Sequence, residues 1–419
     1  MSKKSRDRRP YAQPVTRIDL PHIHVKTRIV LLVLFLAIAA LAFANGVKEF
    51  VSKEPGWQEI SVSSKKPNCS GEFQLMYDFS DAGGGATAQY RQVESLYTQA
   101  VEELYVLFSG DILEDGRYNI AYLNAHPGEE VQVEAELYSA LGQVVESGSR
   151  YGFLAPVMAE YDRLFQSEGE GEAVAYDPTT NPETVAWIGQ VVPFIRDPQH
   201  IRLELTGENR VRLVLSEEYE AFCRDNGIET FFDLGWMTNA FLADAIANRL
   251  LEKGFSNGYL VSYDGFTRNL DTRGTAYSLN LYDIQGTDVY LPAEIGYSGP
   301  RSLVCLRSFP LKEQDRWNYY AFSDGRIVSH FVDPADGMSK TASASFLCYS
   351  TSLDCSDLVV RMAELYVFEN LVLEGVLSLA EEEIYSVWSD AGKLYYSDPQ
   401  LDIQLLPESG PGYSLQLVK

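Results

Sequence analysis

The spacing of apolar side chains predicts several helices. Apolar residues recur every three or four positions over residues 88–108, for example at Val93, Tyr97, Ala100 and Leu104, which is typical of a helix with one buried face. A similar period predicts helices over 133–147, 240–251 and 358–381. Residues 167–183, by contrast, combine acidic side chains with Gly and Pro and predict a surface loop.

Strands are predicted where apolar and polar residues alternate or where aromatic and β-branched residues gather. Alternation on either side of Thr206–Asn209 predicts a hairpin, and residues 384–396 predict another. Further strands are expected over 72–79 and 259–263 and among the Tyr-rich residues 276–332. Because helices and strands mix without regular β–α–β alternation, the predicted fold class is α+β, with mixed sheets and packed helices.

The longest apolar run lies near the N-terminus. Ile29–Ala44 contains 16 apolar residues without interruption, and as a helix it would be about 24 Å long, slightly shorter than a hydrocarbon core. Apolar residues just beyond it favour a transmembrane anchor over 29–47. The small side chains of Ala42 and Ala44 favour instead a signal segment that is cleaved after Ala44. Both interpretations place the residues from about 50 onward outside the cell.

Charge is distributed unevenly along the chain. Residues 1–28 contain eight Lys and Arg side chains against two acidic ones, whereas the whole chain has a net charge of −25. The basic head and the apolar run together indicate a cytoplasmic N-terminus. The remaining body is strongly acidic and repels phosphate backbones, so no nucleic-acid binding is expected.

The cysteines indicate no disulfide framework. They are five in number, have no CxxC spacing, and lie at Cys69, Cys223, Cys305, Cys348 and Cys355. Buried free thiols are the expected state. Cys348 and Cys355 would pair only if the fold brought them together.

Three segments carry residues suited to phosphate or metal chemistry. Asp233–Asp244 predicts a strand that turns into a helix, where unpaired backbone N–H groups favour a phosphate. His330–Gly337 predicts a strand that enters a tight turn. Ser350–Asp357 opens the last long helix, and Asp354 and Asp357 would share a helix face on which carboxylates could hold Mg²⁺ against a phosphate.

Each segment also has a structural explanation. Asp233, Asp354 and Asp357 are suited to capping helix N-termini, and Asp336-Gly337 is a common turn pair. A single His in an apolar strand is more often structural than catalytic. From these residues alone, two interpretations remain open: the segments form a phosphate site, or they are only helix caps and turns.

The order and spacing of the segments resemble the ApbE-type FAD:protein FMN transferases. The motifs of that family run DLGGIAKGYAxD, LVNxGG, HIIDPxTG and DALxT. This chain has DLGWMTNAFLAD (233–244), LVSYDG (260–265), HFVDPADG (330–337) and DLVVR (357–361). The resemblance implies an ApbE-like, T-fold-like domain over 71–405, preceded by a linker over 48–70 and followed by a tail over 406–419.

The resemblance also implies an activity. FMN would move from FAD to a Thr or Ser of an exported flavoprotein, with Mg²⁺ as cofactor and release of AMP. FAD, the flavoprotein acceptor and the membrane would be the partners. The protein would be a single-pass protein of the cell membrane with its main domain extracytoplasmic, or secreted if cleaved.

Site residues follow from the resemblance. Asp357 and Thr238 would hold the metal, and Asp357 and His330 would be catalytic. The residues expected to bind the flavin nucleotide are Asp233, Gly235, Thr238, Asn239, Gly265, His330, Asp333 and Arg361.

Departures from the family pattern favour alternatives. Trp236 and Asn239 replace a Gly and a Lys, Asp264 replaces the first Gly of LVNxGG, and Arg361 replaces the Thr expected beside the metal. The carboxylate of the family's FDPT is absent at Leu154–Val157, and its TSG corresponds only loosely to Arg307–Phe309.

These departures suggest two other kinds of protein. One is a non-catalytic extracytoplasmic relative that binds flavin or a protein partner, with Arg361 as a substitute for the metal cation. The other is a scaffold whose pocket is filled by Trp236 and Arg361.

Overall fold

The computed structural model describes residues 26–27, 29–39, 53–406 and 412–418. The chain divides into two units, Met1–Lys53 and Glu54–Lys419. In the first unit, residues 26–27 and 29–39 are helical, and the rest of the predicted segment 29–47 lies outside the described residues. None of the helices in the described ranges is long and apolar enough to cross a membrane.

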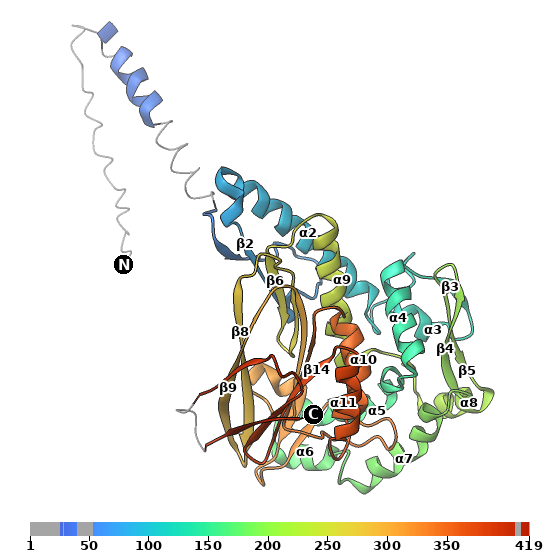
Figure 1. Cartoon of the computed structure of the whole chain (residues 1–419). Helices are drawn as coiled ribbons and strands as arrows, with labels where there is room; N and C mark the ends of the chain where they lie inside the picture. Colours follow the sequence, from blue (N-terminus) through green and yellow to red (C-terminus); the bar gives the residue numbers. More distant parts are fainter. Residues whose placement is uncertain (1–25, 28, 40–52, 407–411, 419) are drawn as a thin grey trace, which may run out of the picture. The chain divides into compact units, whose positions relative to one another are not determined.

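The second unit contains a large mixed β-sheet (Figure 1). Neighbouring strands are antiparallel except for β15 and β17, which are parallel. The two edge strands lie in segments predicted to be the linker and the tail. Within the described residues its nine strands, in spatial order, are β1 (Trp57–Glu59), β2 (Phe73–Asp78), β6 (Gly258–Ser262), β7 (Phe266–Asn269), β10 (Arg301–Arg307), β13 (Ser345–Ser350), β14 (Tyr385–Asp390), β15 (Lys393–Tyr396) and β17 (Ser414–Leu417).

The central strands are apolar at consecutive positions because both faces of the sheet are covered. On β10, Val304 and Leu306 pack into the core beneath the helices. Leu303 and Cys305 pack instead against a second apolar cluster that includes Leu281. Successive side chains of a strand point to opposite faces, so a strand buried on both sides has no polar alternation.

Smaller sheets complete the strands. One covers the face of the large sheet opposite the helices and contains β8 and β9. In the described ranges these sheets are β16 (Asp402–Leu405) with β9 (Asp288–Ser298) and β8 (Ala276–Gln285), β3 (Glu130–Gln132) with β5 (Arg210–Leu215) and β4 (Ile201–Gly207), and β11 (Tyr319–Ala321) with β12 (Ile327–Ser329).

Helices α9 and α10 lie side by side against β7 and β10 (Figure 1). They carry the first and last of the motif segments. The α-helices of the second unit are α2 (Ala86–Leu107), α3 (Ile120–Ala125), α4 (Ala135–Ser147), α5 (Ala155–Phe165), α6 (Glu170–Tyr176), α7 (Pro182–Arg196), α8 (Glu217–Asn226), α9 (Thr238–Glu252), α10 (Cys355–Tyr366) and α11 (Leu373–Glu381). Short 3₁₀ turns are η1 (Ser70–Glu72), η2 (Ser80–Gly85), η3 (Tyr151–Phe153), η4 (Gly235–Met237) and η5 (Glu313–Trp317).

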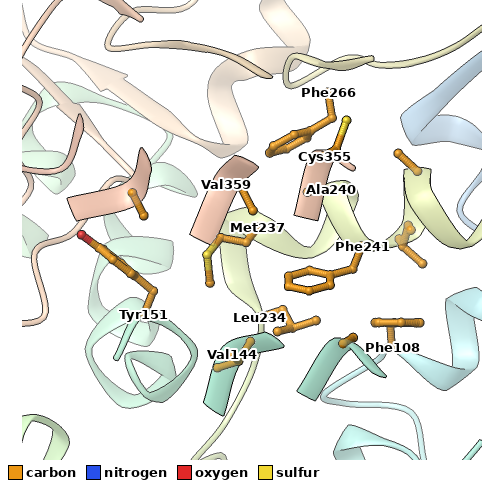
Figure 2. Packing of buried hydrophobic residues seen from close by; sticks show 14 of the residues in the cluster. Phe108, Val144, Tyr151, Leu234, Met237, Ala240, Phe241, Phe266, Cys355 and Val359 are labelled. Atoms are coloured by element: carbon orange, nitrogen blue, oxygen red, sulfur yellow. The ribbon is translucent and has the colours of Figure 1, made fainter. Parts of the chain in front are cut away.

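The start of α9 is fixed by apolar packing. Met237 and Ala240 lie against α10, near Val359, and Phe241 and Phe108 belong to the same buried cluster (Figure 2). Met237, Ala240 and Val359 are fully buried, with no exposed surface. The turn that precedes α9 is therefore held by its own helix, which is embedded in the core.

A buried ion pair ties α9 to α10. The Asp244 carboxylate accepts hydrogen bonds from the backbone N–H groups of Cys355 (3.0 Å) and Ser356 (2.7 Å), the first residues of α10. It also lies 2.5 Å from a guanidinium nitrogen of Arg268 on β7, which contacts Asp354 as well. Asp244 thus caps a neighbouring helix from outside that helix.

Most of the predicted long elements are confirmed. Helices α2, α4 and α9 lie where the apolar period places them, and the predicted hairpins are formed by β4 with β5 and by β14 with β15. The α+β class is confirmed as well.

Two predicted elements are wrong. The predicted loop 167–183 contains helix α6, whose Ala173 is fully buried. Acidic residues at its start are favourable next to the positive end of the helix dipole. The predicted helix 358–381 is two helices, because the Tyr366 carbonyl accepts a hydrogen bond from the backbone N–H of Ala342 (2.7 Å) where α10 ends.

All five cysteines are buried and free, as expected. The Cys355 thiol donates to the backbone oxygen of Thr267 at 3.3 Å, and the Cys348 sulfur lies 3.2 Å from the Ser386 hydroxyl. The two residues that were open to pairing therefore contact other groups.

Replacing Asp244 is expected to destabilise the second unit. In Asp244→Ala, two helix N–H groups lose their acceptor and the Arg268 charge loses its buried partner, so we expect a loss of about 3 to 5 kcal/mol in the free energy of unfolding. Asp354→Ala removes the more exposed partner of the same guanidinium and should cost about 1 kcal/mol. Urea denaturation of both variants measures the difference. Equal losses would contradict the assignment of Asp244 as the principal partner.

Gly265 is expected to tolerate no side chain. Its φ is +111°, and a Cβ there would lie 2.0 Å from the backbone oxygen of Cys305. We expect Gly265→Ala to cost about 3 to 5 kcal/mol. Gly274 also has a positive φ, of +79°, but open space around it, so Gly274→Ala should cost about 1 kcal/mol. Similar losses in denaturation of the two variants would show that strain alone, and not the contact with β10, determines the effect.

Candidate functional site

A cavity of about 480 Å³, called the first cavity, lies where three of the motif segments meet. Asp233 and Asn239 line it from the turn before α9 and from the start of that helix, Asp264 from the β6–β7 turn, and His330 from the end of β12. These residues are far apart in sequence, and the fold brings them to one place.

The turn before α9 is stabilised by its own hydrogen bonds. The Asp233 carboxylate accepts the backbone N–H of Gly235 at 2.6 Å, and the Thr238 hydroxyl donates to the Gly235 carbonyl at 2.7 Å. Gly235 has a φ of +56°, in the left-handed region. Gly110 passes so close to Asp233 that a Cβ there would lie 2.3 Å from a carboxylate oxygen. The position of the Asp233 side chain is therefore fixed from two sides.

Aromatic side chains form part of the wall. Trp236 contacts Tyr151 edge-on, with ring centres 5.9 Å apart, and Phe331 at 5.1 Å. Its indole N–H is buried and has no hydrogen-bond partner among the described residues. Trp317 is exposed and lines the same cavity. Trp236 therefore forms a wall of the cavity and leaves its volume open.

Asp264 is held inside the site by neutral donors. Its carboxylate accepts hydrogen bonds from the Ser262 hydroxyl at 2.5 Å and from the Asn239 side-chain amide at 2.8 Å. Burial raises the pKa of Asp264 to about 6, with the nearby Glu72 charge adding to the effect. Asp264, which replaces the first Gly of the family's LVNxGG motif, is thus held in place by hydrogen bonds as part of the cavity wall.

The first cavity is acidic. Burial raises the pKa of Asp233 to about 6, and the charges of Asp111 and Asp162, which also line the cavity, add to the shift. Glu72 and Asp264 are the other acidic residues of the lining, which contains no Lys or Arg. Carboxyl groups whose ionisation is suppressed by burial are common at functional sites.

His330 is buried and neutral. Burial lowers its pKa to about 3, and its ring lies against those of Tyr319 (5.6 Å between ring centres) and Phe331 (4.3 Å). At ordinary pH its neutral ring can donate one hydrogen bond to a ligand and accept another, but it carries no charge. Its predicted catalytic role stays a prediction.

Other predicted residues support the site without lining it. Thr238 and Gly265 hold the two turns described above. The Asp333 carboxylate accepts the backbone N–H of Ala335 at 2.8 Å and pairs with Lys340 at 3.0 Å, so it stabilises the turn that follows His330.

Asp357 and Arg361 do not reach the first cavity. The Asp357 carboxylate faces the backbone N–H of Asp354 at 3.4 Å, in a capping box at the start of α10. Arg361 is exposed and forms an ion pair with Glu382. The predicted metal residues therefore do not fit a shared metal site, because the Thr238 hydroxyl is bonded to Gly235 and the Asp357 carboxylate is turned toward its own helix. Throughout the described ranges, no group of three or more His, Cys, Asp or Glu side chains is placed to hold a metal ion.

Sequence reasoning missed several lining residues. Glu72, Asp111, Asp162, Tyr151 and Trp317 belong to no motif. These residues are isolated acidic and aromatic side chains without a spacing pattern. Only the order of the segments around them could have pointed to them.

Comparison with solved structures finds proteins of the same fold. The ApbE protein of Thermotoga maritima superimposes with a TM-score of 0.54 at 14% identity, covering 79% of this chain and 94% of that one. The flavin transferase ApbE of Vibrio cholerae gives 0.52 at 12% identity over 84% and 97%. A His-to-Gly mutant of the Vibrio cholerae protein gives 0.50 at 12% over 83% and 97%. This chain has the ApbE fold.

Comparison at the level of sequence gives no such match. No protein-family model matches the chain, and no curated protein matches it. The likeness to ApbE proteins is thus one of fold, and the predicted ApbE-like architecture is confirmed.

Asp264 is expected to make stability depend on pH. Its pKa in the folded state is about 6 and its ordinary value is 3.8, so ionisation opposes folding as pH rises from about 4 to above 6. Asp264→Asn removes that cost and keeps an acceptor for Ser262, while the Asn239 amide can rotate to accept. The gain in the free energy of unfolding should therefore be roughly 1 to 3 kcal/mol larger at pH 8 than at pH 3.5. Asp225→Asn, on the exposed surface of α8, is the matched control, and a pH-independent gain for Asp264→Asn would contradict the assignment.

Proposed function

We propose that this chain binds a flavin nucleotide in the first cavity and does not carry out Mg²⁺-dependent FMN transfer. The observation that carries the proposal is the convergence of three motif segments, 233–239, 260–265 and 330–337, on one cavity, while the fourth, 357–361, does not reach it.

The composition of the cavity supports a planar, heterocyclic ligand. The indoles of Trp236 and Trp317 offer aromatic surfaces, and a ring stacked on an indole gains about 1 to 3 kcal/mol. Asn239, Asp233 and Asp264 offer hydrogen-bonding groups of fixed position. A mostly preformed cavity with aromatic walls and a few placed polar groups is typical of a small-molecule site.

The surroundings of Asp357 argue against metal-dependent transfer. Phosphoryl transfer needs a cation that spreads the developing negative charge. Where the family pattern has a metal carboxylate and a hydroxyl one turn apart, this chain has a capping Asp357 and an Arg361 that is paired with Glu382. The exported location predicted from the basic head and apolar run remains part of the proposal.

FMN transfer to an exported flavoprotein is the second candidate, and the ApbE fold favours it. In that reaction a pyrophosphate bond of FAD breaks, a phosphoester forms with a Thr or Ser hydroxyl of the acceptor, and AMP leaves. Release of AMP therefore separates the two candidates.

The test is calorimetric titration of FAD into the full-length protein, once with Mg²⁺ and once with EDTA, with chromatography for AMP in the presence of an acceptor domain. We expect stoichiometric binding of equal affinity in both buffers and no AMP. Trp236→Ala should weaken binding about tenfold through loss of stacking. Trp57→Ala, which removes an indole from β1, should leave the affinity unchanged.

Three results would contradict the proposal. Absence of FAD binding would leave only the fold. Binding that requires Mg²⁺ would restore Asp357 as a metal ligand. AMP release that depends on Mg²⁺ would establish the second candidate.

A further inference from the structure

Arg307 is a mostly buried cation with a single, long ion pair among the described residues. It is the last residue of β10, and 11% of its side chain is exposed. Its Nε atom is buried and has no hydrogen-bond partner among the described residues. The nearest carboxylate oxygen, on Asp315, lies 3.9 Å from a guanidinium nitrogen, which is too far for a hydrogen bond. A guanidinium stays charged at all ordinary pH values, so this burial is costly unless an anion is bound.

Asp315 does not complete the pair because its oxygen is engaged elsewhere. The same Oδ2 atom accepts the backbone N–H groups of Leu311 at 2.7 Å and Lys312 at 3.2 Å. These bonds fix the start of the η5 turn. Meanwhile, the Tyr319 hydroxyl donates to the Arg307 carbonyl at 2.7 Å and holds the backbone of this residue in place.

Arg307 lines a second cavity, of about 610 Å³, which adjoins the first. The two share a wall that contains Glu72, Asp264 and His330. Arg307 and Lys312 belong only to the second cavity. Both cations lie beyond the shared wall, where Asp315 is the one acidic residue in the described part of the chain that lines only the second cavity.

Lys312 is available as a second cation. It is exposed, and its ammonium nitrogen lies 4.5 Å from the centre of the Tyr263 ring. Like Arg307, it has no carboxylate within hydrogen-bonding distance among the described residues. A guanidinium fork beside an ammonium group is suited to the oxygens of a phosphate.

We propose that Arg307 and Lys312 form an anion subsite that binds a phosphate group of the ligand. The identity of that ligand rests on the proposed function: a flavin nucleotide would place its ring in the first cavity and its phosphate in the second. The subsite takes the role that a metal would have, and it does so on β10 and η5, away from α10.

The subsite is tested by comparing riboflavin, FMN and FAD on the full-length protein. We expect Arg307→Gln to weaken FMN and FAD at least tenfold and to leave riboflavin unchanged. Lys312→Gln should give a smaller loss in the same direction. Arg224→Gln, which removes the same charge from the exposed surface of α8, should change nothing. Inorganic pyrophosphate should compete with FMN but not with riboflavin.

A second measurement separates this subsite from a structural role of Arg307. Because Arg307→Gln removes a mostly buried charge whose only ion pair within the described ranges is long and whose Nε has no hydrogen-bond partner there, its melting temperature should be equal to or above that of the wild type. Pyrophosphate should raise the melting temperature of the wild type and not that of the variant. A lower melting temperature together with equal losses for riboflavin and FMN would show general damage and overturn the proposal.

The outcomes also distinguish the two proposals. If riboflavin and FMN bind with equal affinity and Arg307→Gln changes neither affinity, the proposed function stands and the subsite is overturned. Stabilisation by pyrophosphate that needs Arg307, without binding of any flavin, would leave the subsite standing for another phosphorylated ligand and overturn the proposed function. Absence of both effects would overturn both.

Discussion

The site depends on one buried carboxylate. Asp244 must be compensated because it is almost inaccessible to water, and three groups do this at once: two N–H groups at the start of α10 and the guanidinium of Arg268. Those groups come from a helix and a strand that are far from Asp244 in sequence. Satisfying the charge therefore fixes α9 against α10 and β7, and with α9 the turn that carries Asp233 and Asn239.

Elements with a strong period were predictable, and elements decided by tertiary contacts were not. The long helix α2 presents a regular apolar stripe, and a hairpin such as β14–β15 has its turn residues in place. The end of α10 could not be predicted from the local sequence, because the hydrogen bond at its last residue comes from the backbone N–H of Ala342, on a different segment. Helix α6 was hidden because its acidic residues indicate a loop until a neighbouring element buries Ala173.

The candidate site was predictable only through the resemblance. It identified Asp233, Gly235, Asn239 and His330, which do line the first cavity. However, the position of a residue within a motif does not determine which way its side chain points. Asp357 has the right place in the sequence, but the capping box at the start of α10 turns it toward its own backbone. Arg307 was the opposite case, since it lies in a loosely matching segment and yet has a buried Nε without a hydrogen-bond partner among the residues that the structure describes.

The distribution of charge restricts how an anionic ligand can enter. Five carboxyl groups and no cation line the first cavity, so a phosphate placed there would be repelled even where burial suppresses ionisation. An uncharged heterocycle meets no such barrier and can accept or donate hydrogen bonds with the same carboxyl groups. Beyond the shared wall, the described residues include two cations, Arg307 and Lys312, and one carboxylate, Asp315, whose contact with Arg307 is long, at 3.9 Å. The proposed nucleotide would therefore have one favourable orientation, with its ring among the carboxyl groups of the first cavity and its phosphate near Arg307 and Lys312.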